Sequence, residues 1–264
     1  MTSLAKHQSG EFTKLLLMGD SKSGKTGSLA SLVPKYKLFI LDYDNGLDAL
    51  AQIVRRTDPQ LLERIEFRTL RDKLKSSPTG TIVDGTPTAF VEGLRMLDLW
   101  KYDQVDLGKP AEFGKDSIVV LDSLTFMSDA AFRFWEPLVP RSRDGKYDVR
   151  AVYKNTQDAI ENVLALLTSE SFRANVVVIS HVRYVDNPDG TKKGYPTAVG
   201  SALSPQIPRY FNSVALAQTG PGGKRQIQTA ATAMIDLANP ASFKMLPTLP
   251  IETGLATYFD TLRS

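Results

Sequence analysis

The chain has 264 residues, of which 42% are hydrophobic, and this composition is typical of a globular protein with a substantial core in one large or two small domains. It contains no cysteine and two histidines, which excludes disulfides, thiolate metal sites, cysteine nucleophiles and histidine-rich metal sites. The net charge of +3 arises from 32 basic and 29 acidic residues, so any nucleic-acid binding must depend on local patches.

Residues 1–11 are polar and predict a flexible tail that lacks the apolar core of a signal peptide. No apolar run in the sequence approaches the ~20 residues that a membrane-spanning helix needs. We therefore expect a cytoplasmic protein with no membrane partner.

The first predicted element is a buried strand at residues 15–18, which leads directly into GDSKSGKT, residues Gly19 to Thr26. This is the pattern G-x-x-x-x-G-K-[ST] between a strand and a helix start, the context in which it binds the phosphates of a nucleotide. Gly19 and Gly24 provide backbone freedom, and the helix that begins near Lys25 adds N–H groups and a favourable dipole. A Gly/Ser/Lys surface turn that matches by chance is the alternative.

Each part of this loop has an expected role. Lys25 should reach the β- and γ-phosphates, and the Thr26 hydroxyl should bind Mg²⁺. The predicted cofactors are thus ATP and Mg²⁺, and a guanine nucleotide is disfavoured because the sequence has no N-K-x-D signature. The residues predicted to contact the nucleotide are Gly19, Asp20, Ser21, Lys22, Ser23, Gly24, Lys25, Thr26 and Gly27.

Strands and helices alternate along the rest of the chain. We expect strands at 37–41, 65–70, 117–122, 175–180, 214–217 and 226–229, and helices after the phosphate loop as far as Pro34, at 47–56, 90–100 and 152–172. Loops or irregular segments are expected at 76–86, 101–115, 137–149 and 186–200, and residues 239–264 should hold one short helix at most.

This alternation predicts an α/β fold with a mostly parallel central sheet and helices on both faces. The unbroken apolar runs at 117–122 and 175–180 suit strands that are buried on both faces, as in parallel sheets. Ligands of such sheets bind beyond the carboxyl ends of the strands, where three polar residues of this chain follow strands.

Asp122 is the first of these residues and ends the run IVVLD. A carboxylate there can hold Mg²⁺ through water while Thr26 binds the ion directly. The alternative is a helix N-cap, because Asp122 and Ser123 precede Leu124.

Asp44 and His181 are the other two. Hydrolysis needs a group that orients or deprotonates water, and Asp44 is placed for this after the second strand. Asp42 competes with it on the same side of the strand, and Asp44-Asn45-Gly46 is also strong turn chemistry. His181 can contact the γ-phosphate and report its loss, or it can simply cap the strand.

The motifs resemble those of RecA-type ATPases, especially the small RecA-like ATPases that phages encode near recombination and annealing genes. GDSKSGKT resembles their phosphate loop, FILDYDNGLDAL the segment with the water-activating acid, IVVLDSLTFM the second Walker strand, and VVVISHVRY the strand that ends in a γ-phosphate sensor. The resemblance covers residues 12–230 and implies catalytic roles for Lys25, Asp44 and His181 and metal binding by Thr26 and Asp122.

The resemblance also implies a RecA-like P-loop NTPase core at 12–235, followed by a segment at 236–264 that packs on the core or on a neighbouring subunit. Members of this family form rings or filaments in which ATP sits between subunits and basic residues of one subunit complete the site of the next. Lys224 and Arg225 are candidates for that role in trans, and a solvated hairpin is the alternative reading of this segment.

Single-stranded DNA is the expected partner, with a single-strand-binding or annealing protein as a further one. Two loops combine basic residues with nearby tyrosines, as suits backbone-tracking charge with stacking rings. The candidate DNA contacts are Arg141, Arg143 and Lys146 in the first loop and Arg183, Lys192 and Lys193 in the second. Solvated charged loops are the alternative, and because the loops differ from those of recombinases, strand exchange does not follow from the resemblance.

The leading hypothesis is a Mg²⁺-dependent ATPase that acts on single-stranded DNA in phage-type recombination or replication, in the host cytoplasm if a phage encodes it. A P-loop small-molecule kinase is a second hypothesis, in which arginines such as Arg141, Arg143 and Arg150 would form a lid. The third is a nucleotide-gated adaptor or loader that binds ATP with little turnover.

Overall fold

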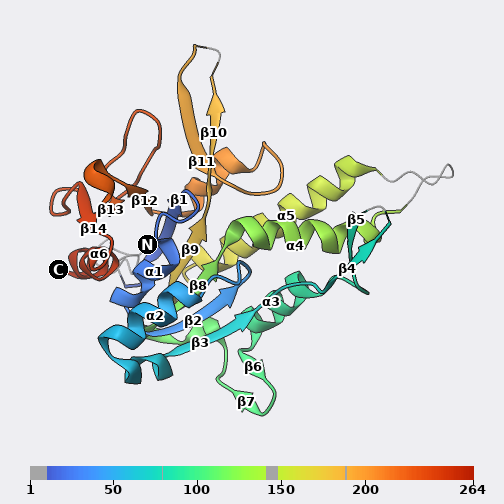
Figure 1. The fold of residues 1–264 in the computed structure, drawn as a ribbon, viewed down its shortest axis with the longest axis horizontal. Helices are drawn as coiled ribbons and strands as arrows, with labels where there is room; N and C mark the ends of the chain where they lie inside the picture. Colours follow the sequence, from blue (N-terminus) through green and yellow to red (C-terminus); the bar gives the residue numbers. More distant parts are fainter. Residues whose placement is uncertain (1–10, 79, 141–147, 188) are drawn as a thin grey trace, which may run out of the picture.

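A computed structural model describes residues 11–78, 80–140, 148–187 and 189–264. Its centre is an eight-stranded sheet (Figure 1). In spatial order the strands are β14 (Thr248–Pro250), β13 (Arg225–Gln228), β12 (Ser213–Thr219), β1 (Lys14–Gly19), β9 (Ala174–Ser180), β8 (Gly114–Asp122), β2 (Lys37–Asp42) and β3 (Ile65–Thr69).

The sheet is mostly parallel. Neighbours from β12 to β3 all pair in parallel, whereas β13 and β14 join the edge antiparallel. Parallel neighbours need crossover connections, and helices supply them here. The predicted α/β class, with a largely parallel sheet between helices, is confirmed and is that of a P-loop NTPase core.

Six α-helices of the described residues flank the sheet: α1 (Lys25–Ser28), α2 (Asp48–Thr57), α3 (Ala89–Asp98), α4 (Leu124–Trp135), α5 (Val149–Thr168) and α6 (Gly254–Arg263). Short 3₁₀ turns lie between these helices and the strands or between two strands: η2 (Leu29–Ser31), η3 (Pro59–Arg64), η4 (Pro110–Glu112), η5 (Glu136–Leu138), η6 (Ser204–Tyr210) and η7 (Pro221–Gly223). Within the described ranges, no helix combines the length and the apolar character needed to cross a bilayer.

The two faces of the sheet have separate cores because side chains of a strand alternate between faces. Leu16 and Met18 of β1 point into a core shared with α3, α4 and α5. Leu15 and Leu17 point into the other core, which α2 and α6 cover together with the segment after α1. The phosphate loop therefore leaves the sheet from a strand that is packed on both sides.

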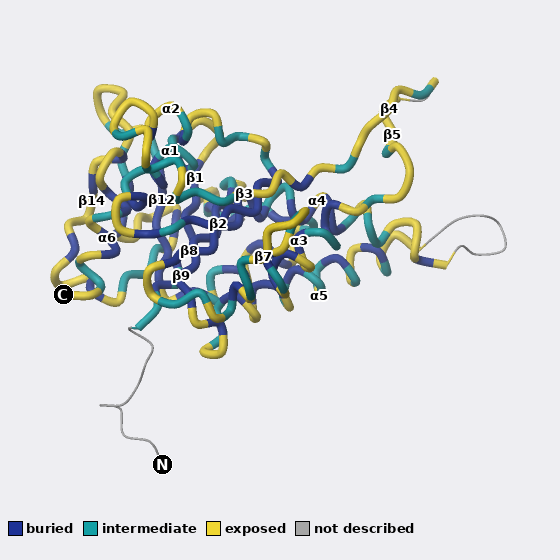
Figure 2. The backbone as a smooth tube through the Cα atoms, turned by 90° about the horizontal axis from the view of Figure 1, so that it is seen from below, coloured by how far each residue is buried: buried dark blue, intermediate teal, exposed yellow. Residues whose placement is uncertain are grey.

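Three hairpins form where loops or irregular segments were expected. They are β4–β5 (Leu74–Ser77 and Gly80–Val83), β6–β7 (Lys101–Tyr102 and Val105–Asp106) and β10–β11 (Val182–Asp186 and Lys192–Pro196). Figure 2 shows β4 and β5 extending from the body with mostly exposed residues. Figure 1 shows β10 and β11 extending from another edge, where β10 is mostly exposed and β11 is partly buried. Exposed ribbons need no buried apolar run, which is why the hydrophobic pattern did not predict them.

Candidate active site

The phosphate loop follows β1, and its structure requires glycine at Gly19 and at Gly24, for different reasons. A Cβ on Gly19 would lie 2.4 Å from the carbonyl oxygen of Ala217 in β12. Gly24 has φ of +96°, a left-handed conformation that side chains rarely adopt. The loop thus has the close backbone approach that phosphate binding needs. Because α1 has only four residues, its dipole contributes less than the sequence suggested, and the loop's own N–H groups are the principal anion donors.

Lys25 is buried at the base of this loop. Its ammonium donates hydrogen bonds to the carbonyl oxygens of Gly19 at 2.9 Å and Asp20 at 2.8 Å. Burial lowers the pKa of Lys25, while the carboxylates of Asp122, Asp44 and Asp20 oppose this shift. The side chain is thereby held across the loop, where it can exchange carbonyl oxygens for phosphate oxygens.

Thr26 and Asp122 meet at the carboxyl edge of the sheet. The Thr26 hydroxyl donates a hydrogen bond of 2.7 Å to Oδ2 of Asp122. The other carboxylate oxygen, Oδ1, is buried and has no hydrogen-bond partner in the described structure. Burial raises the pKa of Asp122 to about 7, and the nearby carboxylates add to the shift, whereas the Thr26 hydroxyl and Lys25 oppose it.

This pair fits Mg²⁺. An orphaned carboxylate oxygen beside a threonine hydroxyl offers two oxygen ligands, and Mg²⁺ in nucleotide sites characteristically takes one or two protein ligands plus phosphate oxygens and water. The described ranges hold no cluster of three or more His, Asp or Glu side chains that would bind a metal alone. Thr26 and Asp122 are thus suited to a cation that arrives with its nucleotide.

The two acids after β2 have different surroundings. Asp42 is buried, accepts bonds from the N–H groups of Asn45 at 2.7 Å and Gly46 at 3.4 Å through Oδ1, and accepts one from the Thr69 hydroxyl at 3.0 Å through Oδ2. Burial raises its pKa. The turn chemistry of this segment therefore belongs to Asp42, which is fully engaged within the protein.

Asp44 is half-buried, and its charge acts on Lys25, Asp122 and His181. Its backbone N–H donates to the carbonyl oxygen of Asp122 at 3.3 Å. The structure thus brings Asp44 to the phosphate loop with a side chain that has no hydrogen-bond partner in the described structure.

His181 follows β9 and joins the same group. Burial lowers its pKa, with a further lowering from Lys25, while Asp44 and Asp20 oppose the shift. Its ring lies edge-on to Phe126, with centroids 5.9 Å apart. The imidazole is therefore neutral at pH 7 and close enough to Lys25 to sense its charge.

Thr125 was missed at the sequence level. Its hydroxyl accepts a bond from the N–H of His181 at 3.1 Å and donates to the carbonyl oxygen of Thr197 at 3.1 Å. It lies in the first turn of α4, directly after Asp122, and connects that turn to both strands at the base of the β10–β11 hairpin. The sequence signal for this residue was a hydroxyl side chain three positions after Asp122.

Arg225 lies beside the phosphate loop of its own chain. A Cβ on Gly24 would be 3.2 Å from Cδ of Arg225. Lys224 is exposed at the η7 turn, where its carbonyl oxygen accepts a 2.7 Å bond from the N–H of Gly220. The assignment of these two residues to a neighbour's site stays a prediction, and the structure adds a position in cis for Arg225.

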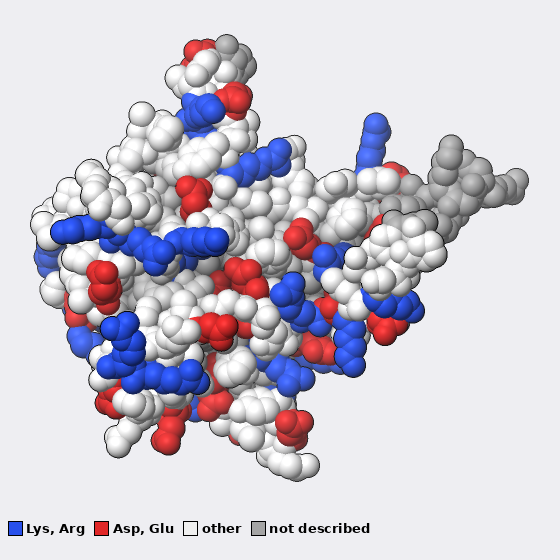
Figure 3. Space-filling model, in the orientation of Figure 1, with Lys and Arg blue, Asp and Glu red and all other residues white. Residues whose placement is uncertain are grey.

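The candidate DNA contacts divide into two sets. Arg141, Arg143 and Lys146 lie outside the described residues. Arg183, Lys192 and Lys193 lie on the β10–β11 hairpin, where basic and acidic side chains are interspersed (Figure 3).

Within the hairpin, the lysines already have acidic partners. Lys192 lies 3.6 Å from Asp186 and Lys193 lies 2.8 Å from Asp236. Arg183 is exposed and has no ion pair in the described part of the chain. Burial and the Asp20 carboxylate raise the pKa of Tyr184, which places this exposed ring on the side of the phosphate loop.

A cavity adjoins the site at the same edge of the sheet. Its lining includes Tyr43, which precedes Asp44, and Phe126, which contacts His181. The full lining is Tyr43, Leu70, Arg71, Asp72, Leu74, Ala89, Phe126, Asp129, Ala130 and Arg133.

Comparison with known proteins gives the family. A family model described as an AAA domain matches residues 11–237, which include every element of the site above. A search of curated proteins finds no match. The matched part covers most of the 264 residues and runs from the start of β1 past β13. The chain therefore belongs to the AAA domain family of P-loop ATPases.

Proposed function

We propose that the protein is a Mg²⁺-dependent ATPase of RecA type that acts on single-stranded DNA. The observation that carries the ATPase proposal is the Thr26–Asp122 hydrogen bond of 2.7 Å with Oδ1 of Asp122 left unpartnered beside Lys25. This arrangement has a use only when a cation and phosphate oxygens complete it.

The residues divide the chemistry of hydrolysis. Lys25 would stabilise charge on the β- and γ-phosphate oxygens, and a bound Mg²⁺ supplies the rest of that neutralisation. Asp44 would orient the attacking water and accept its proton as the water oxygen bonds to the γ-phosphorus. The bond to the bridging oxygen then breaks, and ADP and phosphate leave.

His181 is the proposed sensor. A neutral imidazole can donate a hydrogen bond to a γ-phosphate oxygen, and burial keeps His181 neutral by lowering its pKa. Its backbone N–H is held by Thr125, which also binds Thr197 directly after β11, at the base of the β10–β11 hairpin. Loss of the γ-phosphate would therefore change contacts at the base of that hairpin.

The DNA proposal rests on the hairpin and on the resemblance to RecA-type ATPases. Arg183 and Tyr184 are exposed neighbours on β10, a charge and a ring that suit a single strand. Lys192 and Lys193 would have to exchange carboxylates for phosphates, so Arg183 is the strongest candidate. A ring or filament, a role in phage recombination or replication, and a single-strand-binding or annealing partner are further parts of this proposal.

Two measurements test the proposal. ADP release should require Mg²⁺ and should increase when a single-stranded oligonucleotide is added. Lys25→Ala should remove both the basal and the stimulated rates. ATP binding without turnover, with or without DNA, would favour the nucleotide-gated adaptor instead. Unchanged turnover in the presence of DNA would remove the DNA role while leaving the ATPase.

A phosphotransferase is the second candidate, and one observation favours it. The cavity beside Tyr43 and Phe126 contains Arg71 and Arg133, and Oδ2 of Asp72 is buried there without a hydrogen-bond partner in the described structure. An acceptor bound in this cavity would lie beside Tyr43 and Phe126, the neighbours of Asp44 and His181. A panel of nucleosides and nucleotides that accelerates ADP release and becomes phosphorylated would support this alternative over hydrolysis.

A further inference from the structure

The phosphate loop has little regular secondary structure to maintain its conformation. The helix that follows it, α1, is a single turn of four residues, and isolated turns are unstable because helix nucleation is costly. Lys22 and Gly24 both have positive φ, at 64° and 96°. The loop must therefore be held by packing from other parts of the chain.

Part of that packing comes from the C-terminal region. A Cβ on Gly24 would lie 3.2 Å from Cδ of Arg225 and 3.2 Å from Cγ1 of Ile251. Ile251 is buried, follows β14, and donates its N–H to the carbonyl oxygen of Arg225 at 3.4 Å. The side chains of Arg225 and Ile251 therefore pack against the loop at Gly24.

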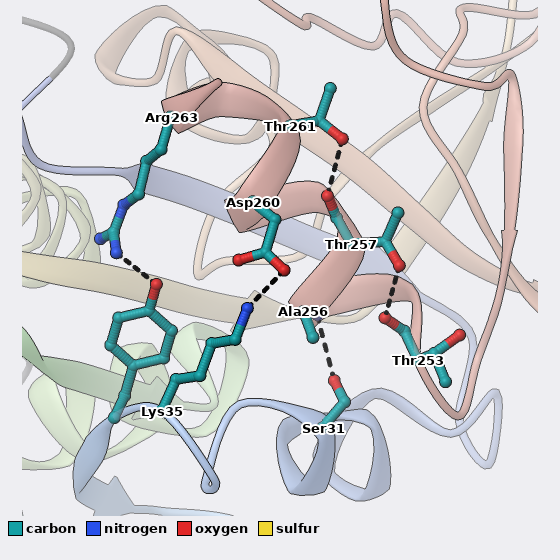
Figure 4. Close-up of polar contacts among 9 residues, drawn as sticks. Ser31, Lys35, Thr253, Ala256, Thr257, Asp260, Thr261 and Arg263 are labelled. Carbon is teal, nitrogen blue, oxygen red and sulfur yellow. Dashed lines mark hydrogen bonds and ion pairs between the residues drawn. The ribbon is translucent and has the colours of Figure 1, made fainter.

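Helix α6 holds the segment that follows α1 (Figure 4). The N–H of Ala256 donates to the Ser31 hydroxyl at 3.2 Å, and Lys35 pairs with Asp260 at 2.6 Å. The side chain of Ser31 belongs to η2, which continues directly from α1. The chain on both sides of Lys25 is therefore in contact with residues after 224.

The last turn of α6 adds a second attachment. Arg263 donates to the Tyr36 hydroxyl and to Oδ1 of Asn175, the latter at 2.9 Å. Tyr36 and Phe259 pack with ring centroids 5.7 Å apart. Since Asn175 lies in β9, α6 is fixed both to the sheet and to the segment after the loop.

We propose that the segment from Thr248 to Arg263 is a functional part of the nucleotide site and that Ile251 is a positioning residue for the phosphate loop. This segment lies beyond the residues that the AAA domain model matches, which end at 237. Ile251 restricts Gly24 before the nucleotide arrives, so that binding does not have to order the loop. The inference rests on the proposed nucleotide binding and concerns how the site is held.

The test compares Ile251→Ala with Leu249→Ala. Leu249 is an isomeric, buried residue of β14 in the same core, and its backbone pairs with Ile227 rather than facing Gly24. Ile251→Ala should weaken Mg²⁺·ATP binding about tenfold while kcat at saturation changes less than about twofold. Leu249→Ala should lower Tm comparably and leave the Kd near that of the wild type. Ile251→Val keeps Cγ1 and should restore most of the affinity.

A second readout needs no nucleotide. In the free protein, Ile251→Ala should increase amide hydrogen exchange in the peptide that covers the phosphate loop, and Leu249→Ala should not. Equal affinity losses or equal exchange increases in the two alanine variants would overturn the inference, as would an Ile251→Ala protein with wild-type values of both. A wild-type protein that binds no ATP would refute the proposed function, while the exchange comparison would still decide the role of Ile251 in loop order.

Discussion

The hydroxyl of Thr26 donates a 2.7 Å hydrogen bond to Oδ2 of Asp122, which joins the phosphate loop to a strand 96 positions along the chain. In the sheet, β9 lies between β1, which leads into the phosphate loop, and β8, which ends at Asp122. The pair therefore depends on the parallel order of β1, β9 and β8, which brings the phosphate loop and Asp122 to the same edge of the sheet. Four predictions follow from it and from its neighbours.

Lys25→Ala should reduce ATP turnover by at least about 100-fold, because the ammonium is the cation closest to the transferred phosphate. Its Gly19 and Asp20 contacts are to carbonyl oxygens of the loop, so folding should be largely preserved. Steady-state ADP release measures the change. Lys101→Ala, which removes a remote surface ion pair with Asp106, is the matched control and should behave as wild type.

Asp122→Asn should stabilise the nucleotide-free protein above neutral pH. The folded pKa of about 7 lies above the ordinary value of an aspartate, 3.8, so the folded state holds the proton more tightly. The ionised carboxylate therefore costs stability increasingly as pH rises from 4 to 7, and the full cost persists above 7. One pKa unit corresponds to about 1.4 kcal/mol, which makes the gain a few kcal/mol.

Thermal unfolding of both proteins between pH 5 and 8, without Mg²⁺ or nucleotide, checks this. The Tm difference should grow as pH rises to about 7 and then level off. A difference that does not change with pH would show that burial of the Asp122 charge is not the cause.

Asp44→Asn should affect turnover, whereas Asp42→Asn should affect stability. Asp44→Asn should lower kcat at least about 100-fold with little change in ATP affinity, because a general base acts in the chemical step. Asp42→Asn should lower Tm, since the two oxygens of Asp42 accept three bonds that shape the turn and asparagine keeps only one acceptor oxygen. If Asp42→Asn abolishes turnover at full stability and Asp44→Asn does not, the two assignments are reversed.

Thr125→Val should uncouple the site from the β10–β11 hairpin. It removes the hydroxyl that joins His181 to Thr197 while keeping a side chain of the same shape. We expect the basal rate to stay within about threefold of wild type and the stimulation by single-stranded DNA to be lost. Ser128→Ala removes the hydroxyl that accepts from Val199 one turn further along α4 and serves as the comparison. Full DNA stimulation in Thr125→Val would exclude this route.

The sequence predicted the central strands and the phosphate loop because these are unbroken apolar runs next to a motif. It did not predict α4, although apolar residues at 124, 127, 130 and 131 have helical spacing, because Asp122 was assigned to Mg²⁺ binding and a helix N-cap was only the alternative there. The hairpins were missed because their strands contain no continuous buried apolar run: β4, β5, β6, β7 and β10 are mostly exposed, and the buried residues of β11 are Gly194 and Pro196.

Other features depend on contacts between distant residues. Strand alternation places Asp42 and Asp44 on one side, and what distinguishes them is that Asp42 is buried and accepts bonds from Asn45, Gly46 and, in the next strand, Thr69. The position of Arg225 and Ile251 against Gly24 likewise follows from the antiparallel pairing of β12, β13 and β14. No local pattern in the sequence specifies these pairings.

The most direct test of the central claim is ADP release by the purified 264-residue chain with ATP, measured with Mg²⁺, with excess EDTA, and with Mg²⁺ plus a single-stranded oligonucleotide. The account predicts turnover that requires Mg²⁺, rises with DNA, and disappears in Lys25→Ala. The account would be contradicted if the wild type released no more ADP than Lys25→Ala in any of the three conditions.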